Sequence, residues 1–145
     1  MIMKRKWLYI GVAAASVLQF LFERTWHELI FTNSYGDFHS VLKGSPQSDF
    51  MFLSEAAFAL VVGFFYLHVP DQKRSLRSGM TIGSILGLLV GMCQMFGWYG
   101  TFTCSLSVVV MEIIKMIFRG FISGAAISAA ELKTNPRSKP SAAIS

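Results

Sequence analysis

Four long apolar runs, near residues 7–30, 50–69, 79–99 and 102–130, constrain this chain more than any other feature of its sequence. Because a helix rises about 1.5 Å per residue, each run is long enough to cross a hydrocarbon layer about 30 Å thick. The runs also lack the strict alternation of apolar and polar residues that the strands of a membrane barrel show. Only 14% of the 145 residues are charged, whereas 53% are hydrophobic. The sequence therefore predicts an all-α fold, an integral membrane four-helix transmembrane bundle over residues 1–130.

Basic residues gather in three short segments, and their positions predict the topology. The segments are 4–6, 73–77 and 133–139, which precede the first run, separate the second from the third, and follow the fourth. Basic loops are retained in the cytoplasm, so the prediction is N-in and C-in, in a bacterial inner membrane. Residues 131–145 contain Pro, Ser and Lys and are predicted to form a disordered cytoplasmic tail. This distribution explains the net charge of +5 without a surface for nucleic acid, so no nucleic-acid partner is expected.

Glycines recur every four residues in the third run, and small residues recur similarly in the fourth. Lipid provides no hydrophobic drive for helix association, so small residues that let backbones approach closely mark packing faces. The pattern predicts a flat face on each helix that packs against a neighbour, in this chain or in another. The glycines concerned are Gly79, Gly83, Gly87 and Gly91 in the third run, and Gly120 and Gly124 in the fourth.

Three ionisable residues, Glu112, Lys115 and Arg119, lie inside the fourth run at spacings of three and four. These spacings place them on one face of a helix. Gln19, in the first run, is a further polar residue at membrane depth. Ionisable groups within a membrane are costly and call for a partner or a role. One interpretation is a self-neutralising trio that faces the bundle or a partner subunit. The other is a proton- or ion-coupling site in which Glu112 is the titrating carboxylate.

A second polar group is predicted on the outer side of the membrane. It comprises Glu23 and His27 of the first run, Glu55 of the second and Gln94 of the third. Two carboxylates and an imidazole could bind a divalent metal such as zinc or manganese. The same residues could instead form salt bridges with Arg24, and the metal is the less expected of these two alternatives.

No other cofactor or catalytic motif is indicated. The three histidines, His27, His39 and His68, do not fall at matching depths on facing helices, so haem is not expected. The chain contains no nucleophile elbow, phosphate-binding loop, dinucleotide fingerprint or zinc-protease motif. An enzyme is therefore less expected than a protein that binds, assembles or transports.

The two cysteines, Cys93 and Cys104, lie on either side of the predicted outer turn between the third and fourth runs. They are expected at similar depth, and the outer compartment permits a disulfide between them. Two packed thiols are the alternative. The absence of a C-x-x-C pair weighs against a thiol–disulfide oxidoreductase.

The layout resembles small bacterial four-span membrane protein families of unknown function. The shared features are Trp26 at the outer end of the first run, Tyr35 in an aromatic loop, the glycine repeat, a mid-span acidic residue, and the sequence 119–121, Arg-Gly-Phe. The resemblance covers most of the chain. It implies the fold and no activity.

Two functions remain open, and both need the lipid bilayer and a membrane protein partner or self-association. The first is an accessory or assembly subunit that meets a larger membrane complex through its glycine faces and the Glu112–Lys115 pair. The alternative is a homo-oligomeric small transporter or channel that uses Glu112 as its coupling residue. An enzyme at the outer interface, using Glu23, His27 and Glu55, is a third and less favoured hypothesis.

Overall fold

The computed structural model describes residues 6–26, 28, 48–101 and 105–134. Across these residues the regular structure is entirely helical, so the all-α prediction is confirmed for this part of the chain. Four long helices and one short 3-10 helix follow one another along the sequence. They are α1 (Lys6–Thr25), α2 (Ser48–Leu67), η3 (Asp71–Lys73), α3 (Leu76–Thr101) and α4 (Leu106–Thr134).

The helix boundaries differ from the predicted runs by a few residues. The largest consequence is at the end of α4, which continues to Thr134 and so includes residues 131–134, predicted to belong to the tail. Glu131 is only 1% exposed, because it lies on the face of α4 that packs into the bundle. The remaining tail, residues 135–145, lies outside the described residues.

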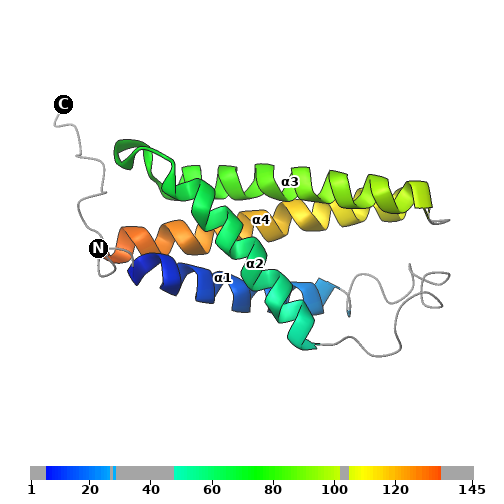
Figure 1. The fold of residues 1–145 in the computed structure, drawn as a ribbon, viewed down its shortest axis with the longest axis horizontal. Coiled ribbons are helices and arrows are strands. Elements are labelled where there is room, and N and C mark those ends of the chain that lie inside the picture. The colour runs from blue at the N-terminus through cyan, green and yellow to red at the C-terminus, as the bar shows by residue number, and fades with distance from the viewer. Residues whose placement is uncertain (1–5, 27, 29–47, 102–104, 135–145) are drawn as a thin grey trace.

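The helices form an up-and-down bundle with two distinct ends (Figure 1). α3 and α4 run side by side along their length, α1 lies along α4, and α2 crosses in front of them. α1 and α3 begin, and α2 and α4 finish, at the same end of the bundle. We call this the basic end, and we call the opposite end, where the last turn of α1 carries Arg24, the far end. Five described cationic side chains lie at or near helix termini at the basic end. The residues are Lys6, Lys73, Arg74, Arg77 and Lys133.

The bundle buries polar side chains and exposes large apolar ones, the reverse of a water-soluble helical domain. Gln19 is 0% exposed and Glu55 is 3% exposed, whereas Phe64 is 57% exposed. Of the four long helices described, two, α2 and α3, are apolar enough to cross a membrane, which supports an association of this chain with a membrane. The four-span arrangement stays a prediction. Exposed apolar side chains occur on every long helix, including Leu18 and Leu21 on α1, Phe64 and Phe65 on α2, Ile85 and Leu89 on α3, and Phe118 and Phe121 on α4.

The glycine faces of α3 and α4 pack directly against each other. A Cβ atom added to Gly83 would overlap the carbonyl oxygen of Gly120, and one added to Gly124 would overlap that of Gly79. Gly87 lies equally close to the backbone of Met116. Backbone contact of this kind requires glycine at the crossing. The predicted packing faces are therefore used within the chain and are covered in the folded bundle.

Candidate functional site: a buried ionic cluster

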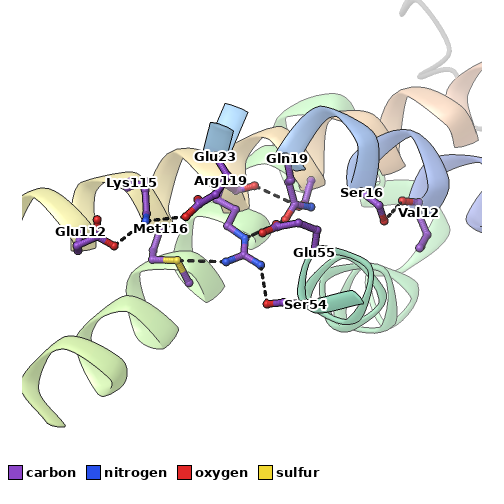
Figure 2. A network of polar contacts seen from close by, with 11 residues as sticks. Val12, Ser16, Gln19, Glu23, Ser54, Glu55, Glu112, Lys115, Met116 and Arg119 are labelled. Carbon is purple, nitrogen blue, oxygen red and sulfur yellow. Dashed lines mark hydrogen bonds and ion pairs between the residues drawn. The ribbon is translucent and has the colours of Figure 1, made fainter. Parts of the chain in front are cut away.

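Arg119 is the hub of a polar network in the middle of the bundle (Figure 2). It lies about 20 Å from either end of α4, counted at 1.5 Å per residue. Its Nε lies 2.6 Å from Oε2 of Glu55 on α2 and donates to Oε1 of Gln19 on α1 at 3.1 Å. Its Nη2 donates to Oγ of Ser54 at 3.4 Å, and its guanidinium stands 5.0 Å from the centre of the Phe58 ring. Arg119 thus joins three helices.

Lys115 forms a second centre one helical turn closer to the far end. Its Nζ lies 2.8 Å from Oε1 of Glu23 on α1 and 2.6 Å from Oε2 of Glu112 on its own helix. The Lys115 side chain is 5% exposed, and those of Glu23 and Glu112 are 12% and 14% exposed. At this burial an ammonium group requires negatively charged partners, and it has two.

Gln19 connects Arg119 to Ser123, which lies one turn farther along α4. Its amide donates to Oγ of Ser123, which in turn donates to the carbonyl oxygen of Arg119 at 3.1 Å. Gln19 and Ser123 are both 0% exposed. Residues three and four apart share one helix face, so the side chains that α4 contributes to this network all come from a single stripe of the helix. We call this set the ionic cluster: Gln19, Glu23, Ser54, Glu55, Glu112, Lys115, Arg119 and Ser123.

The ionic cluster combines more carboxylates than cations. Among the described residues, its carboxylates are Glu23, Glu55 and Glu112, and its cations are Lys115 and Arg119. With every group ionised, these side chains would carry one net negative charge. Charged groups are costly to hold away from water, so these five side chains are candidates for a functional role.

A separate ion pair lies at the basic end. Nη1 of Arg74 is 3.1 Å from Oε1 of Glu131 on α4 and 2.7 Å from the exposed carboxylate of Asp71. The same guanidinium donates to the carbonyl oxygens of Val69 at 2.9 Å and Leu67 at 2.6 Å. Arg74 therefore caps the C-terminal end of α2 and fastens the α2–α3 connection to α4.

The structure merges the two polar groups that the sequence suggested. Glu23 and Glu55, assigned to an outer group, contact the cations of the α4 stripe. Gln94 is exposed on α3 and does not join them, and His27 lies outside the described residues. Arg24 pairs instead with Glu28 on the surface, at 2.8 Å. No three His, Cys, Asp or Glu side chains of the described segments are grouped so as to hold a metal ion.

The predicted disulfide concerns one described residue and one that is not. Cys93 is exposed on α3 and forms no disulfide with another described residue. Cys104 lies outside the described residues, so the pairing stays a prediction. Cys93 does not belong to the ionic cluster, which lies nearer the middle of the bundle.

Four polar residues of these networks were not singled out from the sequence: Ser54, Arg74, Ser123 and Glu131. A signal for two of them was present, because Ser123 and Glu131 continue the three-to-four-residue spacing of Glu112, Lys115 and Arg119 along α4. Arg74 was used only as one of the basic residues from which the topology was predicted. Ser54 follows no pattern that separates it from other serines in apolar helices.

Comparison with known proteins adds no relative to this description. The chain matches no family model, no curated protein and no solved structure. The ionic cluster is therefore the feature of the molecule from which a function has to be inferred.

Proposed function

We propose that this chain is a four-span integral membrane protein with both ends of the described chain on the cytoplasmic side. Two observations support the proposal for α1 and α4, which hold most of the ionisable residues. Glu23 of α1 and Lys115 of α4 face each other inside the bundle, and the outer faces of these helices present side chains such as Leu21 and Phe118. The basic end then lies in the cytoplasm, as the positive-inside bias requires.

We further propose that the ionic cluster takes up and releases a proton as the coupling site of a small transporter or channel. The observation on which this rests is the set of three carboxylates held by two cations in the middle of a bundle with an apolar exterior. An intramembrane ionisable residue that faces the bundle interior is a functional site by default. A proton suits this site better than a larger ion, because it needs no cavity.

The chemistry is a simple protonation. A carboxylate of the cluster accepts one proton and becomes a neutral carboxylic acid, which removes the net negative charge. The charged groups that face one another are Glu23 from α1, Glu55 from α2, and Glu112, Lys115 and Arg119 from α4; the described part of α3 contributes none. Because each ion pair except Glu112–Lys115 joins two helices, protonation weakens a contact between helices and shifts their arrangement.

The role predicted for Glu112 alone is thereby extended to all three carboxylates. Glu112 bonds within its own helix, whereas Glu55 ties α2 to α4 and is the least exposed of the three at 3%. Glu55 is thus the residue at which a change of protonation alters the bundle most directly.

The test is proton movement into proteoliposomes that contain a trapped pH-sensitive dye and are driven by a potassium diffusion potential. The wild-type chain should carry protons faster than empty vesicles do. Glu55→Gln and Glu112→Gln should return the rate to the level of empty vesicles. Glu28→Gln is the matched control, because this carboxylate is 62% exposed and lies outside the cluster, and it should behave as wild type. Equal rates for all four proteins would refute the coupling role.

The accessory-subunit hypothesis remains a second proposal, supported by a different surface from the one first expected. The glycine faces are covered, but α3 and α4 extend farther toward the far end than α1 and α2 do (Figure 1). There Phe96 and Tyr99 are exposed, and a Cβ added to Gly97 or Gly100 would meet no atom within 4 Å. Native mass spectrometry after mild detergent extraction should show a hetero-complex if a partner covers this surface. A pure homo-oligomer would count against it.

A further inference from the structure

The polar stripe of α4 is interrupted at one position. Glu112, Lys115, Arg119 and Ser123 follow one another at three- and four-residue steps, and the next two positions of the same face are Ile127 and Glu131. Ile127 is 0% exposed and is the apolar member of this series. Counted at 1.5 Å per residue, about 12 Å separates Ser123 from Glu131 along the helix.

Ile127 belongs to a continuous apolar layer that crosses the bundle. α1 and α2 supply the rest of the layer. Four of its members besides Ile127 are 0% exposed: Ala15, Ala59, Val62 and Tyr66. The inner part of this layer resists the entry of water, because the side chains around Ile127 offer an entering molecule no polar atom. The polar atoms of the layer, the Tyr66 hydroxyl and the Trp7 indole N–H, belong to residues at its basic end. The layer comprises Trp7, Val12, Ala15, Phe58, Ala59, Val62, Tyr66 and Ile127.

Two glycines close the layer around Ile127. A Cβ added to Gly11 of α1 would lie 2.8 Å from the Cα of Ile127, so α1 and α4 are in backbone contact at this level. A Cβ added to Gly63 of α2 would lie 2.8 Å from Cδ1 of Leu8 and 3.7 Å from Cδ1 of Ile127. α1, α2 and α4 therefore meet around Ile127, where the polar stripe is broken.

The two sides of this layer differ in their exposure. Toward the far end, the side chains of Glu23 and Glu112 are 12% and 14% exposed, whereas Glu55, nearer the layer, is 3% exposed. Toward the basic end, Glu131 is 1% exposed and is held by Arg74. The ionic cluster is therefore more exposed at its far-end edge than at the edge that meets the layer.

We infer that the apolar layer around Ile127 insulates the ionic cluster from the basic end, so that its proton exchanges with water at the far end only. The inference rests on the proposed proton site and adds the side from which that site is filled. In the membrane orientation proposed above, the conformation described is the outward-accessible one. The cluster gains its proton from, and returns it to, the outer side until the layer opens.

Substitution of Ile127 tests the inference in the proteoliposome assay. Ile127→Thr keeps the branched shape and adds a hydroxyl that can bond an entering water molecule. It should raise proton entry about tenfold over wild type, the factor that one added hydrogen bond supplies. Ile127→Val is the matched control, because it shortens the side chain without adding a polar atom, and it should leave the rate close to that of wild type.

The outcomes separate this inference from the proposed function. If Ile127→Thr is no faster than Ile127→Val while Glu55→Gln still abolishes wild-type flux, the insulating role is overturned and the proton site stands. If wild type and Glu55→Gln both match empty vesicles, the proton site itself fails, and the inference fails with it. Ile127→Ser is a second polar variant in case the threonine protein does not fold, and it should raise the rate in the same way.

Discussion

Replacing Arg119 with leucine removes the cation that serves the most deeply buried carboxylate of the ionic cluster. Oε2 of Glu55 lies 2.6 Å from Nε of Arg119, and the Glu55 side chain is 3% exposed. Breaking a buried pair by removing one partner leaves an uncompensated charge and costs about 3–5 kcal/mol. The Arg119→Leu chain should therefore lose roughly two to three and a half powers of ten in its folding equilibrium. Arg24 offers a matched control, since its pair with Glu28 is exposed and should contribute at most about 1 kcal/mol.

Reversible unfolding in mixed micelles with a rising fraction of dodecyl sulfate measures these differences, and the buried Trp7 supplies a fluorescence signal. Arg119→Leu combined with Glu55→Gln should recover most of the lost stability, because the second change removes the stranded charge. The account would be refuted if Arg119→Leu cost no more than Arg24→Leu, or if the double variant were as unstable as the sum of the two single variants.

Two further predictions concern packing and the basic end. Gly83→Ala should destabilise the bundle by at least about 1–3 kcal/mol, because the new methyl group overlaps the backbone of Gly120. Gly97→Ala is the control: its methyl group meets no atom within 4 Å, so it should be neutral or stabilising by up to about 1 kcal/mol. Unfolding in mixed micelles measures both variants, and equal effects on stability would contradict the packing described. Arg74→Met should release the α2–α3 connection, so that limited proteolysis cuts near Lys73 at a lower protease concentration than in wild type. Unchanged cleavage would show that the contacts of Arg74 with Glu131 and the end of α2 do not hold this connection.

The helices could be predicted because their apolar runs are long, and their packing could be predicted in part because glycine spacing is a local signal. Gly79, Gly83 and Gly87 mark a face on α3 from sequence alone. Whether that face meets α4 or another protein depends on how the helices are arranged in space. The spacing of residues within one helix contains no information on this point.

The ionic cluster shows the same limit. The stripe of Glu112, Lys115 and Arg119 follows from helical periodicity, but its partners Glu23 and Glu55 come from helices whose depth and rotation no local pattern specifies. The sequence assigned these two carboxylates to a separate outer group, whereas they contact Lys115 and Arg119. Charge pairing would have linked the two groups, because a buried carboxylate is stabilised by a nearby cation, and the fourth run contains Lys115 and Arg119.

The proton of the ionic cluster is the central claim, and infrared spectroscopy of the reconstituted protein tests it most directly. A carboxylic acid in an apolar setting absorbs at a position distinct from that of a carboxylate, so titration of the sample reports the protonation of buried carboxyl groups. We predict a protonated-carboxyl band that rises and falls with pH, disappears or shifts in Glu55→Gln, and persists in Glu28→Gln. The absence of any such band from wild type across the pH range in which the protein stays folded would contradict the account.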